Sequence, residues 1–132
     1  MKVVLQRVRS ASVSVEGITI SKIGPGYLLL VGLAAGDDEA TVRRLAVDVS
    51  KARLMPDALG KMGVNLRDAR GQALAVSQFT LLADFSKGNR PSFNGAAKPE
   101  IAKPLFDLFV QELGQLLGQP VPTLSGGEAQ RL

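Results

Sequence analysis

Residues 27–33, which read YLLLVGL, form a nearly continuous apolar run that constrains the fold more than any other segment. A strand that is buried on both faces of a sheet typically has this pattern. Gly24, Pro25 and Gly26 break the chain immediately before the run, as expected of a turn between two strands. We therefore predict a central strand here. The run is far shorter than the roughly 20 apolar residues of a membrane-spanning helix.

The flanking segments predict further strands and two helices. Alternating apolar residues over 2–23, with Glu16 and Gly17 as a tight turn, predict a β-hairpin or meander. Apolar residues at helical spacing predict a helix that is capped by Asp37 or Asp38 and ends near residue 50. A second helix starts at residue 99 or, with Pro104 in the first turn, near residue 103, and ends at Gly118.

Shorter strands are expected near residues 53–55, 64–66 and 121, and a long strand is expected to carry residues 77–80. This order predicts an α+β fold with a mostly antiparallel sheet and two main helices. A chain of 132 residues fits a single domain spanning residues 1–132. The sheet edges of such a domain favour self-association.

The composition excludes several kinds of catalytic site. With no histidine and no cysteine, the chain cannot form Ser-His or Cys-His pairs or the usual zinc sites. The absence of cysteine, together with an N-terminus MKVVLQRV unlike a signal peptide, predicts a cytoplasmic protein. A net charge of +4 and a pI of about 9.8 favour an acidic partner such as RNA.

The segment 74–93, LAVSQFTLLADFSKGNRPSF, combines polar residues in an apolar strand with a basic loop. A buried polar group without a partner costs about 1–3 kcal/mol, so Ser77, Gln78 and Thr80 imply either a hydrogen-bond network or a ligand. Strand alternation would place Gln78 and Thr80 on one face. Lys87 and Arg90 in the following loop suit an anionic ligand, and the alternative is a solvated surface turn, which is the more common role of a basic loop.

Arg7 and Arg9 lie in an otherwise apolar strand. A buried guanidinium normally binds carbonyl groups or a carboxylate, so either arginine could orient a site loop or point to solvent.

The chain resembles the D-aminoacyl-tRNA deacylases, also called D-tyrosyl-tRNA deacylases. The resemblance is carried by MKVVLQRV, IGPGYLLLVGL, GKM and, most specifically, SQFTLLADFSKGNRPSF. It implies a barrel-like homodimer without metal or organic cofactor that hydrolyses the ester of D-aminoacyl-tRNA or of glycyl-tRNA, an editing reaction. An RNA-binding or structural member of the family that no longer turns over is the alternative, whereas an unrelated hydrolase would need a nucleophile elbow that is missing here.

The resemblance also implies roles for individual residues. Thr80 and Gln78 would be catalytic, Ser77, Phe79, Phe93 and Met62 would bind substrate, Lys87, Arg90 and Lys61 would bind RNA, and Arg7 would have an orienting role. Because no histidine can activate Thr80, we expect it to position the substrate rather than to attack it. Backbone N–H groups around Phe79 and Thr80 would stabilise the oxyanion, and a ribose hydroxyl would assist the attacking water.

The family also has a Gly-Pro motif near its C-terminus that excludes L-amino acids from the partner subunit's site. The 132 residues end at GGEAQRL, before this motif would occur, and Gly24-Pro25 matches a different family segment. Either the reading frame is incomplete or the member is divergent. We expect a polypeptide without this segment to be less stable and to discriminate poorly between D- and L-aminoacyl-tRNA.

Overall fold

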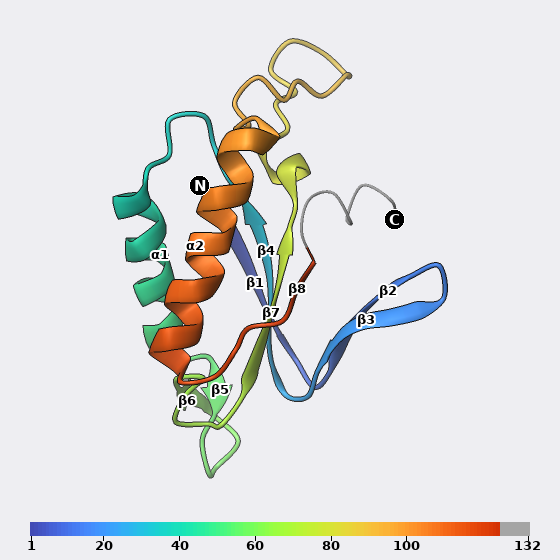
Figure 1. Cartoon of the computed structure of the whole chain (residues 1–132). Coiled ribbons are helices and arrows are strands. Elements are labelled where there is room, and N and C mark those ends of the chain that lie inside the picture. Colours follow the sequence, from blue (N-terminus) through green and yellow to red (C-terminus); the bar gives the residue numbers. More distant parts are fainter. Residues whose placement is uncertain (125–132) are drawn as a thin grey trace.

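The computed structural model describes residues 1–124, which contain two long helices, a short 3-10 helix (η1) and eight strands (Figure 1). In chain order the elements are β1 (Lys2–Val8), β2 (Ala11–Val15), β3 (Ile18–Ile23), β4 (Gly26–Gly32), α1 (Glu39–Lys51), β5 (Met55–Pro56), β6 (Met62–Val64), β7 (Gln72–Ser77), η1 (Phe79–Leu82), α2 (Pro99–Leu117) and β8 (Thr123–Leu124).

The central sheet has the strand order β1-β4-β7-β8, so the predicted strand at residues 27–33 is confirmed as the inner strand β4. It pairs antiparallel with β1 but parallel with β7, and β7 in turn pairs parallel with β8. The expectation of a mostly antiparallel sheet is therefore wrong for this sheet. Its strands are joined through α1 and α2, and long helical crossovers produce parallel neighbours.

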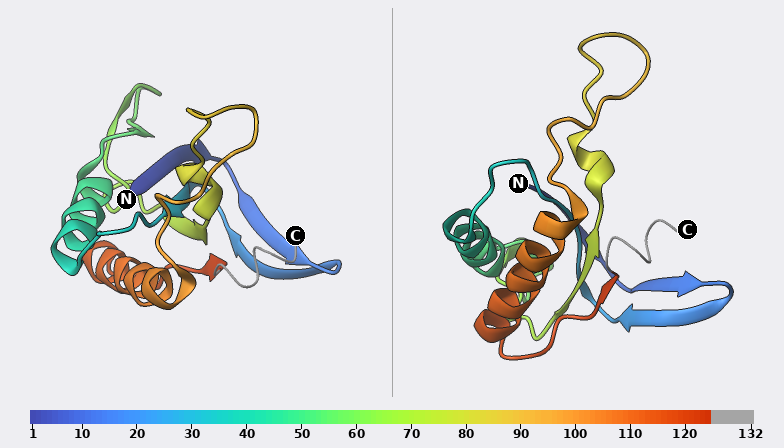
Figure 2. Two further views of the ribbon diagram at one scale, coloured as in Figure 1. Left: turned by 90° about the horizontal axis from the view of Figure 1, so that it is seen from above. Right: turned by 45° about the horizontal axis from the view of Figure 1, so that its top comes forward.

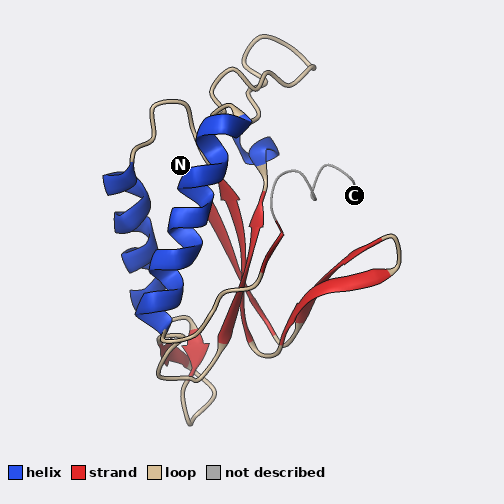
Figure 3. Cartoon of the chain, in the orientation of Figure 1, coloured by secondary structure: helices blue, strands red, loops and turns tan. Residues whose placement is uncertain are grey.

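The expected barrel is also not found among residues 1–124. The strands form the open four-stranded sheet and two separate two-stranded ribbons, β2-β3 and β5-β6. Figure 3 shows the two ribbons at different places around the central sheet. The fold class is α+β, as predicted, but the sheet is not closed.

Both long helices cover one face of the sheet, and the main core lies between them and β4 (Figure 1). Asp38 caps α1 by accepting a hydrogen bond from the N–H of Thr41, and Gly118 ends α2 with a φ of 75°. Because α2 begins at Pro99, the first of the two expected starts is confirmed, the alternative start near residue 103 is wrong, and Pro104 lies inside the helix. No helix in the described part of the chain is long and apolar enough to cross a membrane.

The β2-β3 hairpin projects from the opposite side of the sheet (Figure 2). Its turn places Glu16 and Gly17 at φ angles of 52° and 79°, which is typical of a tight hairpin turn. At its base, Ile23 is buried with Leu74, Val76 and Leu124 in a second, smaller apolar cluster.

Candidate functional site

The predicted polar cluster lies where β7 ends, not inside a strand. Ser77 is the last residue of β7, Gln78 caps η1, and Thr80 is in the first turn of η1. The strand alternation expected for these residues is therefore wrong. Their predicted burial is wrong too, because Ser77 and Gln78 are half-buried and Thr80 is exposed. The cluster is open to a ligand at the edge of the sheet.

Gln78 and Thr80 contact each other directly. The Gln78 side-chain amide Nε2 donates a hydrogen bond to the Thr80 hydroxyl Oγ1. A hydroxyl has one hydrogen to donate and can accept in addition. The Thr80 hydroxyl that accepts from Gln78 can thus still donate its own hydrogen to a ligand.

The backbone at η1 also leaves donors free. The first N–H groups of a helix have no intrahelical acceptor, because the residues that would supply one come before the helix. In the described structure, neither the N–H of Phe79 nor that of Thr80 donates to another backbone or side-chain group. Two main-chain donors therefore lie beside the Thr80 hydroxyl.

The position of η1 is set by contacts that the sequence analysis missed. The N–H of Gln78 donates to the Val31 carbonyl at 2.8 Å, and the Lys2 ammonium donates to the Leu81 carbonyl at 3.3 Å. A Cβ atom at Gly32 would lie only 3.1 Å from the Gln78 carbonyl oxygen. A glycine within a strand can mark such a close approach, so Gly32 in the apolar run was the available signal.

The basic loop begins beside η1 and extends away from the body of the molecule (Figure 2). Phe93 in this loop packs edge-to-face on Phe79, with ring centroids 5.0 Å apart and an interplanar angle of 66°. Phe79 is still 44% exposed. Lys87 and Arg90 are exposed near the outer end of the loop. The loop thus places two cations on the same end of the molecule as Thr80.

Asp84 anchors the start of this loop. Its backbone pairs with Ser92 in both directions at 2.8 Å, which closes the loop at its base. The N–H of Ser86 donates to the Asp84 carboxylate and lowers the pKa of Asp84 below its usual value. The carboxylate is therefore ionised at neutral pH and belongs to the loop's own scaffold.

Three of the predicted site residues lie at the end of the folded molecule opposite Thr80. Lys61 and Met62 are in the β5-β6 ribbon, below the sheet in Figure 1. Arg7 donates to the Leu54 carbonyl at 3.0 Å and pairs with Tyr27 at the start of β4, whereas Gln78 binds Val31 near the end of β4. A single chain therefore does not bring these three residues together with Thr80.

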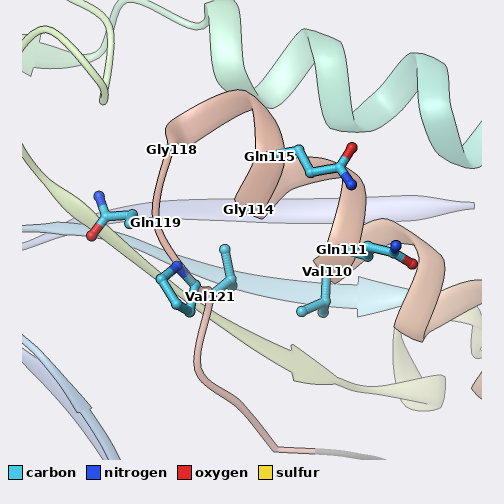
Figure 4. Close-up of a pocket in the computed structure, with 8 residues that line it drawn as sticks. Val110, Gln111, Gly114, Gln115, Gly118, Gln119 and Val121 are labelled. Atoms are coloured by element: carbon cyan, nitrogen blue, oxygen red, sulfur yellow. The ribbon is translucent and has the colours of Figure 1, made fainter.

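A groove of about 560 Å³ lies elsewhere, between the C-terminal half of α2 and the segment that follows it (Figure 4). It is lined by Val110, Gln111, Gly114, Gln115, Gly118, Gln119, Pro120 and Val121, and contains none of the predicted site residues. Among residues 1–124, no three acidic side chains are gathered as a metal ion would require.

Comparison of the sequence with known protein families identifies the family of this chain. A family model described as D-Tyr-tRNA(Tyr) deacylase matches residues 4–131. The chain belongs to the D-Tyr-tRNA(Tyr) deacylase family. The family resemblance inferred from the sequence motifs is thereby confirmed.

Individual relatives support this assignment. A D-aminoacyl-tRNA deacylase of Thermomicrobium roseum is 54% identical over 123 residues, which is 93% of this chain and 79% of the relative. One from Dechloromonas aromatica is 49% identical over the same share of this chain and 82% of the relative. This family member thus aligns with most of each relative's length.

Two solved structures have the same fold. The c-Myc DNA unwinding element binding protein superposes with a TM-score of 0.87 at 32% identity, over 96% of this chain and 86% of that protein. A probable eukaryotic D-amino acid tRNA deacylase superposes with a TM-score of 0.76 at 16% identity, over 88% and 68% of the two chains. The second likeness concerns the fold alone.

Proposed function

We propose that this chain hydrolyses the ester between a D-amino acid and the terminal adenosine of tRNA, and so edits mischarged tRNA. Membership of the D-Tyr-tRNA(Tyr) deacylase family is the observation that carries the proposal. Exposed donors at Phe79 and Thr80 are what an acyl-transfer site requires. Glycyl-tRNA, including glycine mischarged on alanine tRNA, is a second substrate of the same bond type.

The reaction needs no protein nucleophile. The oxygen of a water molecule bonds to the ester carbonyl carbon, and the carbonyl oxygen becomes negatively charged. The N–H groups of Phe79 and Thr80 donate to this oxygen, since neither has another acceptor in the described structure. The bond to the ribose oxygen then breaks, and that oxygen takes a proton from the water. The neighbouring ribose hydroxyl assists by orienting the water.

Thr80 positions the substrate in this scheme. Its hydroxyl oxygen accepts from the Gln78 amide, and this interaction makes the oxygen a poorer nucleophile. Gln78 orients the hydroxyl so that its hydrogen points toward the substrate. Ser77, Phe79 and Phe93 supply the adjacent surface for the amino acid and the adenosine, and Lys87 and Arg90 contact RNA phosphates.

We further propose that the active form is a cytoplasmic homodimer. Thr80 is exposed, Phe79 is 44% exposed, and Phe85 in the following loop is 58% exposed. The opposite end of the same molecule carries Lys61, Met62 and Arg7. A second copy of the chain is therefore needed to bring these residues to the site. A two-fold arrangement does this twice, because each chain offers one end to its partner.

Substitution of Thr80 tests the chemistry. We expect Thr80→Ala to lower kcat/KM for D-tyrosyl-tRNA by about 10- to 100-fold. Removal of one oxyanion-hole donor can lower kcat by up to about 1000-fold, so the effect of Thr80→Ala is expected to be smaller. Thr80→Ser, which keeps the hydroxyl, should retain most of the activity. Removal of a true nucleophile costs on the order of 10⁶-fold. Such a loss, together with an acyl-enzyme detected by mass spectrometry of the wild type, would show that Thr80 attacks the ester.

The second candidate is a nucleic-acid-binding protein without turnover. It is favoured by the 32% identity to a protein that is named for binding a DNA element. Release of D-tyrosine from charged tRNA, measured against an enzyme-free control, separates the two. Turnover supports the deacylase, and binding without release supports the second candidate.

A further inference from the structure

The end of the molecule opposite Thr80 has a concentrated positive charge. Residues 51–70 contain five cations, against the two carboxylates of Asp57 and Asp68. We call the five together the basal surface: Lys51, Arg53, Lys61, Arg67 and Arg70, all of which are exposed. They come from the end of α1, the β5-β6 ribbon and the segments on either side of this ribbon, which lies at the lower end of the molecule in Figure 1.

Two of these arginines are held in place by main-chain carbonyl groups. The Arg53 Nε donates to the Gly63 carbonyl at 2.7 Å, and the Arg67 Nη1 donates to the Leu116 carbonyl near the end of α2 at 3.2 Å. A guanidinium has five N–H donors, and each of these contacts uses one. The side chains are thus oriented while most of their donors stay available.

No basal residue forms an ion pair in the part of the chain that the structure describes. Within residues 1–124, the ion pairs involve the N-terminus, Arg43 and Lys103. Asp57 instead accepts from the N–H groups of Leu59 and Lys61 in its own turn. Oriented cations without acidic partners are the arrangement expected at a site for a polyanion.

Two more guanidiniums extend the charge around a shallow notch. The notch has a volume of about 370 Å³ and is lined by Arg7, Val8, Arg9, Pro25, Met55 and Pro56. Arg7 is fixed here by its hydrogen bond to Leu54. The notch is a concave, positively charged depression next to the basal surface. Such a depression suits a phosphate group of a nucleic-acid backbone.

We propose that the basal surface, centred on Arg53, Arg67 and Arg70, binds the sugar-phosphate backbone of RNA at nucleotides away from the acylated end of that RNA. This inference rests on the proposed function, because it assigns a second contact region to the same tRNA. The contacts are to phosphates and carry no base specificity. They hold the body of the RNA while η1 and the 83–98 loop hold its acylated end.

Charge removal with a matched control tests this proposal. The basal variant is R53Q/R67Q/R70Q, and the control R44Q/K22Q/K103Q removes the same charge from α1, β3 and α2. Binding of uncharged tRNA is measured by fluorescence anisotropy from 50 to 200 mM salt. We expect the basal variant to bind about 10- to 100-fold more weakly and its slope of log K against log salt to fall by about 2–3, as for three lost phosphate contacts. The control should change binding by less than about 3-fold.

A second variant protects the test against misfolding. Lys51 and Arg70 donate no side-chain hydrogen bond in the described structure, whereas Arg53 and Arg67 do, so K51Q/R70N removes two charges without removing a hydrogen bond. It should weaken tRNA binding by about 3- to 10-fold, again with a smaller salt slope. Circular dichroism melting confirms that each variant is folded.

The outcomes also separate this inference from the proposed function. For D-tyrosyl-tRNA, the basal variants should raise KM and leave kcat within about 2-fold, because they do not touch the reacting atoms. Wild-type binding without hydrolysis would refute the deacylase but keep the basal site. Equal weakening by basal and control variants, or no weakening by either, would overturn the basal site. Binding of anionic vesicles instead of RNA would overturn it as well.

Discussion

Gly32→Ala perturbs the candidate site through a single methyl group. The added Cβ would lie 3.1 Å from the Gln78 carbonyl oxygen and 3.2 Å from the Leu81 Cβ, both closer than ordinary van der Waals contact. Residue 78 cannot simply move away, because its N–H is bound to the Val31 carbonyl at 2.8 Å. The clash therefore shifts η1, and with it the N–H groups of Phe79 and Thr80, by a few tenths of an ångström.

The expected loss follows from the sensitivity of catalysis to position. A displacement of about 1 Å can cost on the order of 100-fold in rate, so a few tenths correspond to roughly 3- to 10-fold in kcat. The stability cost is smaller. Overpacking of about 1 kcal/mol is partly offset by the lower entropy that alanine brings to the unfolded chain. We thus expect lower kcat with a melting temperature within about 5 °C of the wild type.

Single-turnover hydrolysis of D-tyrosyl-tRNA at saturating enzyme measures this effect directly, and thermal unfolding is followed in parallel. Gly24→Ala is the matched control, because its Cβ would meet only the Gln72 side-chain oxygen at an ordinary 3.5 Å. It should leave kcat unchanged. A Gly32→Ala variant with wild-type kcat would refute the reasoning that the placement of η1 sets the rate. So would equal losses in both variants.

Two further predictions concern acid stability and assembly. The hydrogen bond from the Thr41 N–H lowers the pKa of Asp38 in the folded state. The ionised Asp38 therefore stabilises the fold fully above the ordinary aspartate pKa, and this stabilisation is lost as the pH falls through the lowered pKa of the folded state. Asp38→Ala should thus lower the melting temperature at pH 7 and flatten its decline in acid, and an unchanged acid profile would contradict this. If the site combines two chains, mixing the impaired Thr80→Ala and Met62→Ala dimers and exchanging their subunits should raise turnover to about a quarter of the wild-type value, because half of the dimers contain one intact site. No recovery after verified exchange would argue for a site within one chain.

Local signals in the sequence predicted most of the individual elements. The tight turn at Glu16 and Gly17, the cap at Asp38 and the end of α2 at Gly118 all have the expected conformation. Each depends on a few neighbouring residues, through a positive φ angle or a side-chain hydrogen bond to the backbone. Such features can be read without knowledge of the rest of the fold.

The predictions that failed depend on residues distant in the chain. The parallel pairing of β4 with β7 and of β7 with β8 requires α1 and α2 to carry the chain back across the sheet. The end of β7 at Ser77 is fixed by the binding of Gln78 to Val31 and by the missing side chain of Gly32. An apolar pattern that continues through Phe79 to Leu82 does not reveal this change from strand to 3-10 helix.

The sequence by itself determined the family, through motifs such as SQFTL and KGNRPSF, and excluded imidazole and thiol chemistry by composition. The tertiary structure decided that the half-buried Gln78 and the exposed Thr80 lie beside two free N–H groups. It also placed Lys61, Met62 and Arg7 at the end of the folded molecule opposite Thr80. The physical reason is that residue types set which reactions are available, whereas the position of a side chain depends on how separate segments pack against one another.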